Sequence, residues 1–164
     1  MKQNKKNEYG FTLIELLMVI AIIMILVSIT WVAVGQMRGR GRDARRARDI
    51  NQLHKALEMY HSGEQEYPLN DEGLISSCDN NWQRLLTILK ESPEVVDPIN
   101  STSYCYYYTA DKDNSAQCNG RDVGSEIGFI IGFKAESRAP DTFGQLTGIT
   151  ECDNGNCYCL ADKL

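Results

Sequence analysis

The feature that most constrains this chain is an apolar run from Phe11 to Val34, in which Glu15 is the only charged residue. At about 1.5 Å per residue, a helix of this length matches a hydrocarbon core about 30 Å thick. A secretory signal peptide has a core of only about 7–15 apolar residues, so the run is too long for one. A carboxylate at membrane depth costs at least a few kcal/mol unless it is paired or reaches the interface. The run predicts a membrane-spanning helix over residues 11–34 and leaves Glu15 to be explained.

The charge of the chain is divided between its two parts. Residues 1–48 carry nine Lys and Arg against three acidic residues, and residues 49–164 carry eight against nineteen. This division favours contacts with anionic lipid or between unlike parts of neighbouring copies. The segment from Arg38 to Arg48 superficially resembles a nucleic-acid patch, but no aromatic residue for base stacking lies among its arginines, so we expect no nucleic acid as a partner.

All six cysteines lie between residues 78 and 159, after the apolar run and the basic segment. An even number confined to a small segment predicts disulfide bonds and an oxidising compartment, although six cysteines allow fifteen pairings. A metal cluster on Cys152, Cys157 and Cys159 is the alternative, which lacks a second ligand pair at a familiar spacing. The arginines after the apolar run would by themselves place the second half inside the cell. The cysteines favour the opposite orientation, with this half outside the cytoplasm.

The start of the chain resembles a known processing site. A short lysine-bearing leader ends at Gly10, and Phe11-Thr12-Leu13-Ile14-Glu15 opens the apolar run. This pattern resembles the N-terminus of type IV pilins and type II secretion pseudopilins. The resemblance implies that a prepilin peptidase cleaves between Gly10 and Phe11, that the new amine of Phe11 is N-methylated, and that Glu15 is an assembly residue.

Such processing would explain the glutamate. Cleavage creates a positive amine on Phe11, and Glu15 of a neighbouring copy can neutralise it at low dielectric. A buried charge without its partner costs about 3–5 kcal/mol, so copies would join only when amine and carboxylate are in register. The alternative is a glutamate at a helix start that favours the helix dipole and extends toward the interface.

The resemblance continues with decreasing strength to about residue 108. Ala56-Leu57, Tyr60, Tyr67-Pro68 and Glu72-Gly73-Leu74 fall at positions similar to those of major pseudopilins, and Asp97-Pro98 precedes an aromatic segment as in that family. Members of the family often bind calcium in their C-terminal loops. The ligands of that family site have no counterpart that we can map on this sequence. Separately, Asp111, Asp113, Ser115 and Asp122 fit positions one, three, five and twelve of a general calcium-loop template, without its glycine and with Asp in place of its final Glu. Calcium is therefore possible, and a polar hairpin loop is the alternative.

The rest of the sequence predicts an α+β fold. Ala47, Ile50, Leu53, Leu57 and Tyr60 recur at helical spacing, so the helix continues past the apolar run as an amphipathic segment that packs on a small antiparallel sheet. Residues 104–109, 127–134 and 157–160 are the expected strands, and residues 82–89 a short second helix. We expect a leader over 1–10, a helix over 11–62, and an extracytoplasmic globular head over 63–164.

Three glycines, Gly35, Gly39 and Gly41, predict a soft joint between the two halves of the helix, because each costs about 1 kcal/mol of helix stability relative to alanine. His54 and His61 lie on one helix face without further metal ligands nearby in sequence, and no nucleophile turn or phosphate-binding loop is present. We expect no enzymatic activity, no metal-dependent catalysis and no cofactor.

Together these features predict a filament subunit, of either a type IV pilus or a type II secretion pseudopilus. Its expected partners are further copies in a helical filament, the prepilin peptidase, an inner-membrane assembly platform with its ATPase, and membrane lipid. A minor or competence-type pilin that binds DNA or a surface, and a membrane-tethered binding module that never assembles, remain alternatives.

Overall fold

The computed structural model describes residues 11–69, 71–91, 95–124, 127–137, 139–152 and 155–163, and for residues 29–34, 36 and 163 it describes the backbone alone. The chain divides into two compact units, a stem that ends at Arg38 and a head that begins at Gly39. One helix, α1 (Leu13–Glu64), contributes to both. Each unit is described by itself.

Helix α1 ends at Glu64, two residues after the predicted end of the helix at residue 62. Gln65 takes a left-handed conformation with φ of 62°, and its N–H donates to the carbonyl of His61 at 2.8 Å. This closing bond satisfies a carbonyl of the last turn, so Gln65 acts as the C-terminal cap. The three glycines predicted to form a joint all lie within the continuous helix. Bending or unwinding there stays a prediction.

The stem exposes its apolar side chains. The large ones described between Leu13 and Val27 are each 40–76% exposed. Among the described residues, no helix is found with a stretch long and apolar enough to cross a membrane. The span expected over residues 11–34 is therefore not found there, and its last six side chains lie outside the described set.

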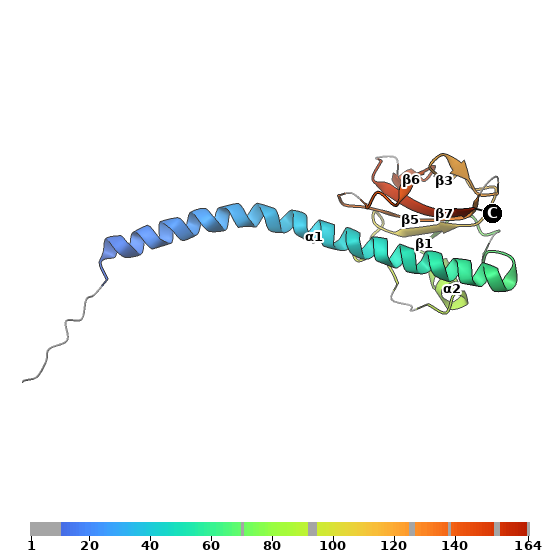
Figure 1. Ribbon diagram of the computed structural model, residues 1–164, viewed down its shortest axis with the longest axis horizontal. Coiled ribbons are helices and arrows are strands. Elements are labelled where there is room, and N and C mark those ends of the chain that lie inside the picture. Colours follow the sequence, from blue (N-terminus) through green and yellow to red (C-terminus); the bar gives the residue numbers. More distant parts are fainter. Residues whose placement is uncertain are drawn as a thin grey trace, which may run out of the picture. The chain divides into compact units, whose positions relative to one another are not determined.

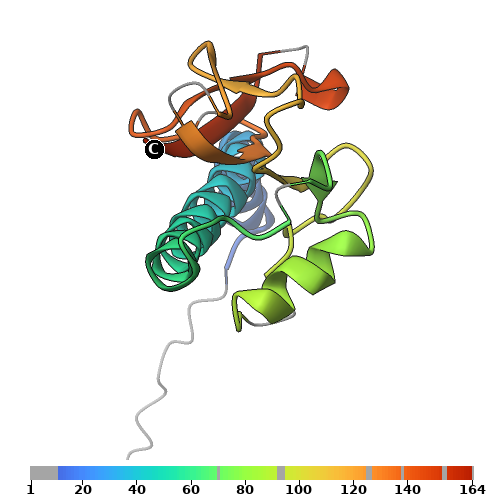
Figure 2. The ribbon, with the colours of Figure 1, turned by 90° about the vertical axis from the view of Figure 1, so that its right-hand side faces the viewer.

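The head is built on an antiparallel sheet, which lies along the second half of α1 (Figures 1 and 2). The strand order is β1-β2-β5-β7-β6-β3-β4. The bounds of the described strands are β1 Ile75–Ser76, β2 Tyr106–Thr109, β3 Gln117–Cys118, β4 Arg121–Asp122, β5 Ile127–Lys134, β6 Gly144–Thr147 and β7 Cys157–Lys163. The helix α2 (Asn81–Ile88) and the short 3₁₀ helix η1 (Thr150–Cys152) complete the head. This is the predicted α+β layout of a long helix packed on an antiparallel sheet.

The central strand β5 separates two apolar clusters. Phe129, Ile131 and Phe133 pack in the cluster that contains the apolar stripe of α1 and the buried side of α2. Ile127 and Ile130 belong to a second cluster, which contains five of the six half-cystines. Because both faces of β5 are covered, its sequence is continuously apolar instead of alternating.

Three disulfides hold the second cluster and the edges of the sheet. They are Cys78–Cys105, Cys118–Cys159 and Cys152–Cys157. The first joins the segment after β1 to the residue before β2, the second joins β3 to β7, and the third joins η1 to the start of β7. The predicted disulfides are therefore present, and the alternative of a metal cluster on three of these cysteines is wrong, because their sulfur atoms are bonded in pairs.

One turn needs glycine for two reasons. Gly148 follows β6 with φ of +79°, and a Cβ atom there would lie 1.9 Å from the carbonyl oxygen of Ser115. The left-handed conformation and the close approach of a second backbone both exclude a side chain. The Ser115 hydroxyl also donates to the Gly148 carbonyl at 3.0 Å, which ties the loop before β3 to the end of β6.

Candidate functional site

The start of α1 contains the predicted processing and assembly residues. Gly10 lies outside the described residues, so the scissile bond itself is not described. Phe11 is 91% exposed. Glu15 Oε2 accepts hydrogen bonds from the Thr12 N–H at 2.8 Å and from the Thr12 hydroxyl at 2.7 Å. The Glu15 N–H donates in turn to Thr12 Oγ1 at 3.4 Å.

This reciprocal arrangement is a capping box. Thr12 precedes the first helical residue, and Glu15 is the third residue of the helix, which is the spacing at which a side chain reaches back to the cap. A carboxylate in the first turn also interacts favourably with the helix dipole. The structure thus gives Glu15 a local role that the sequence analysis treated only as the alternative to an intermolecular one.

The capping box leaves part of the Glu15 carboxylate available. Both bonds from Thr12 reach Oε2, whereas an ionised carboxylate offers about four acceptor positions. Among the described residues, no hydrogen bond to Oε1 is present. Glu15 can therefore accept a further donor, such as an amine, without losing its bonds to Thr12.

The second group of charged residues lies where α1 enters the head. We call Arg42, Asp43, Arg46, Asp97 and Glu136 the Arg46 cluster. The Arg46 side chain is fully buried, as is that of Asp97. Arg46 donates from Nε and Nη2 to the two oxygens of Asp97 at 2.6 and 3.0 Å, and from Nη1 to Asp43 at 2.7 Å and to Glu136 at 2.9 Å.

Backbone groups complete the Arg46 cluster. Asp43 accepts the N–H groups of Glu136 and Ser137 at 3.0 and 2.8 Å. Asp97 accepts the N–H of Ile99 at 2.8 Å. The cluster therefore joins α1 to the loop after β5 and to the loop before β2. A buried charge network is tolerated only when its polar groups are satisfied, and each of the five charged side chains of this cluster has a partner.

The charges of the cluster lower the pKa of the Glu136 carboxyl. Its carboxylate takes a two-pronged hydrogen bond from Arg42, with Nε to Oε1 at 2.6 Å. This bond is the largest cause of a lowered pKa, which falls to about 2 although burial opposes the change. Glu136 thus stays ionised at any pH well above this value.

Three further arginines of α1 in the head, Arg40, Arg45 and Arg48, lie on its outer side. Arg40 is exposed, and the side chains of Arg45 and Arg48 are 48% and 77% exposed. At about 100° per residue these three lie within about 140° of one another around the helix. The division of the basic segment into an outward and a buried part was not predicted. Its signal in the sequence is the Asp43–Arg46 spacing, which places both side chains on one helix face.

The calcium-loop template and the two histidines of α1 do not form a metal site within the described residues. Asp111 accepts the Asp113 N–H at 2.9 Å, and Asp122 accepts from Gln117 at 3.0 Å. Since β3 pairs with β4, the second half of the calcium template is a polar hairpin. His61 stacks on Tyr67 at 4.3 Å between ring centroids. Within the described residues, no group of three or more His, Cys, Asp or Glu side chains is placed to hold a metal.

Comparison with known proteins finds two similarities. Residues 5–31 match the family model of the prokaryotic N-terminal methylation motif. A segment of 71 residues, 43% of this chain, is 41% identical to the type IV wide pilus major component PilA4 of Thermus thermophilus. The chain spans about half the length of that relative, 54%. No solved structure matches the chain.

Proposed function

We propose that the chain is a member of the type IV pilin and pseudopilin family and a structural subunit of an extracellular filament, a type IV pilus or a type II secretion pseudopilus. The match to the N-terminal methylation motif and the similarity to a pilus component support this proposal. The precursor is membrane-anchored, cleaved after Gly10 by a prepilin peptidase and N-methylated on Phe11. It has no enzymatic activity. Further copies are its main partners, and an assembly platform with its ATPase drives incorporation.

The observation that carries this proposal is the geometry of Glu15. Its Oε2 is held by Thr12, so the carboxylate is oriented before any second copy arrives. Its other oxygen can accept the positive amine that cleavage creates on a neighbouring Phe11. The exposed apolar side chains of the stem supply the surface that neighbouring stems would bury, at about 25 cal/mol per Å². Glu15 then selects the register in which these apolar surfaces meet.

Two substitutions separate the intermolecular role of Glu15 from its capping role. Glu15→Gln keeps an acceptor oxygen for the Thr12 cap, since glutamine serves at this position of a capping box, but it removes the negative charge. Glu15→Ala removes both. We expect both variants to be made and cleaved, and both to be absent from sheared filaments viewed by electron microscopy. If the Glu15→Gln variant forms filaments at the wild-type yield, the negative charge of Glu15 is not needed for assembly and its role is limited to the Thr12 cap.

The mature N-terminus gives the matching chemical test. Mass spectrometry of the purified chain should show a start at Phe11 that carries one methyl group. An intact Met1 would instead indicate a membrane-tethered module that never assembles, and would contradict the proposed function. If Phe11 is methylated but the chain is found only as a monomer, the proposed processing is supported and the proposed assembly is rejected.

A further inference from the structure

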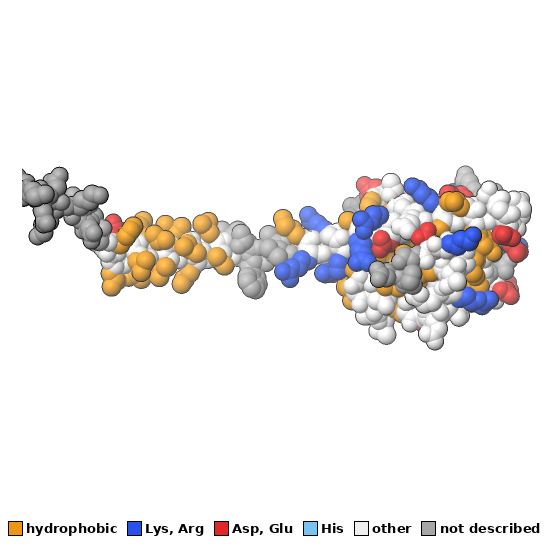
Figure 3. All heavy atoms as spheres, turned by 90° about the horizontal axis from the view of Figure 1, so that it is seen from below, with side chains coloured by type: hydrophobic (Ala, Val, Ile, Leu, Met, Phe, Trp, Pro, Cys, Tyr) orange, Lys and Arg blue, Asp and Glu red, His pale blue; other side chains and the backbone are white. Residues whose placement is uncertain are grey.

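Within the described residues, three outward arginines of the head have a single carboxylate, that of Asp49, at ion-pair distance. We call Arg40, Arg45 and Arg48 the arginine row. Asp49 lies 3.4 Å from Arg45 and 3.9 Å from Arg48, and its Oδ2 also accepts the Tyr106 hydroxyl at 3.0 Å. One carboxylate thus faces two guanidinium groups, and the row keeps a net positive charge. Figure 3 shows lysine and arginine side chains gathered around α1 in this region.

The opposite end of the head has a hollow suited to guanidinium groups. It has a volume of about 470 Å³ and lies between the end of α1 and the loop after β2. Four carboxylates line it, from Glu66, Asp71, Asp111 and Asp113, against one lysine, Lys112. One wall is the stacked ring pair of His61 and Tyr67. Arginine binds such sites better than lysine does, because its planar group forms forked bonds to carboxylates and stacks on aromatic rings.

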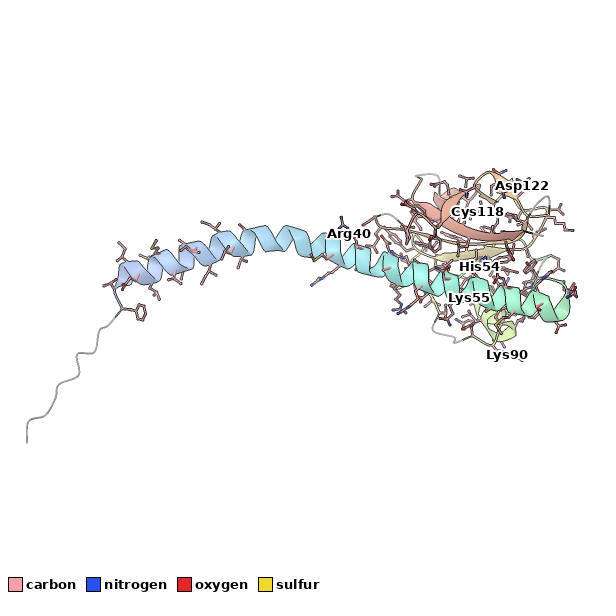
Figure 4. The ribbon with its side chains drawn as sticks, in the orientation of Figure 1. Arg40, His54, Lys55, Lys90, Cys118 and Asp122 are labelled. Carbon is pink, nitrogen blue, oxygen red and sulfur yellow. A yellow bond between two sulfur atoms is a disulfide. The ribbon has the colours of Figure 1, made fainter. Side chains whose placement is uncertain are left out.

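The two surfaces cannot meet on one chain. Arg40 and His61 lie about 30 Å apart along α1 at about 1.5 Å per residue. Figure 4 places Arg40 where α1 enters the head, and acidic side chains are visible at the far end of the head in Figure 3. Two complementary surfaces at opposite ends give a head-to-tail contact between copies. A contact of this kind repeats without closing unless its rotation happens to close a ring, so it builds a filament.

We propose that the arginine row of one copy docks into the acidic hollow of the next copy, and that this contact sets the register between heads. The inference rests on the proposed function, since it assumes that copies assemble. It adds a second recognition contact, which is separate from the one at Glu15. Its strength depends on exposed charges, so filaments should be less stable at high salt, where the Debye length falls to about 3 Å.

Charge reversal with rescue tests the contact in the full chain. The variant Arg40→Glu/Arg48→Glu reverses the row, and Glu66→Arg/Asp113→Arg reverses the hollow. Each is expected to lower the yield of sheared filaments about tenfold, as loss of two exposed ion pairs predicts. The variant with all four substitutions restores opposite charges and should recover at least half of the wild-type yield. Cleavage at Gly10 and circular dichroism should stay unchanged in every variant.

A matched control keeps the same change in net charge. Lys55→Glu/Lys90→Glu alters two exposed lysines that belong to neither the row nor the acidic hollow (Figure 4), although both line one hollow with Arg48. This variant should assemble normally. The inference is overturned if the arginine-row variant assembles normally, or if it fails and the fourfold variant fails as well. In the second case, loss of binding to vesicles containing phosphatidylglycerol would identify lipid as the partner of the row.

The two proposals fail in different ways. If the wild-type chain forms filaments and every charge-reversal variant forms them as well, the arginine contact is rejected and the filament function is retained. A wild-type chain that is uncut at Gly10 and never forms filaments rejects both.

Discussion

Replacing Arg46 by methionine tests whether the head depends on its buried charge cluster. The Arg46 side chain is inaccessible to solvent, and so is Asp97, while Asp43 is 3% exposed. Methionine fills a similar volume without polar atoms. It would leave these carboxylates with backbone donors only, at a depth where water cannot replace the guanidinium. Breaking a buried ion pair from one side costs about 3–5 kcal/mol, which is a large part of a total stability of about 5–15 kcal/mol.

The measurement is urea unfolding of the full chain in a mild detergent. Trp82 reports on the head, because its side chain is buried and its indole N–H donates to the Val95 carbonyl at 2.8 Å. Trp31→Phe in every chain removes the other tryptophan, so that fluorescence follows the head alone. The Arg46→Met variant should unfold at lower urea with an unchanged slope, because the area exposed on unfolding stays the same.

Two further variants show whether the loss comes from the unpaired charge. Arg46→Lys keeps the charge but not the fork that binds both oxygens of Asp97, so its loss should be smaller. Arg46→Met/Asp97→Asn removes one of the unpaired carboxylates and should recover part of the loss. A change of less than about 1 kcal/mol in Arg46→Met would refute the reasoning, since it would show that the carboxylates reach water or protonate at little cost.

Two other predictions concern the acid sensitivity of the head and its disulfides. Because Arg42 lowers the pKa of Glu136 to about 2 in the folded head, from an ordinary 4.5, Glu136 stabilises the fold above about pH 4.5. This contribution should be lost as the pH falls from 4.5 toward 2, and Arg42→Ala should reduce that acid sensitivity in pH-dependent urea midpoints. Replacing Cys118 and Cys159 by serine opens a bridge across 41 residues. It should cost about 2–5 kcal/mol and lower the melting temperature more than opening the bridge across five residues.

The elements that the sequence predicted correctly are the ones with a long or continuous pattern. Strand β5 was expected over residues 127–134 and has those bounds, because eight residues of apolar and β-favouring character can form little else between turns. The stripe from Ala47 to Leu57 is buried as its helical spacing indicated. The four strands β1, β3, β4 and β6 were missed, since each has only two to four residues and none has the aromatic run that indicated β2.

For the candidate site, the sequence supplied the residues but not all of their neighbours. The Thr12–Glu15 capping box is local, so four consecutive residues determine it. The disulfide pairing is not local: six cysteines were predicted to pair, but Cys118 finds Cys159 only after β3, β6 and β7 have aligned. In the same way, Arg45 and Arg46 are neighbours of identical type in the sequence, and only one of them is buried.

What the sequence alone determined is therefore the long helix, the apolar stem, the cap at its start and the processing motif. Each depends on residues within a few positions of one another. The tertiary structure decided which arginines are buried in ion pairs inside the head and which are exposed on its surface. Asp97 and Glu136 reach Arg46 from 51 and 90 residues away, and a distance of that kind in sequence is bridged only when the sheet folds against α1.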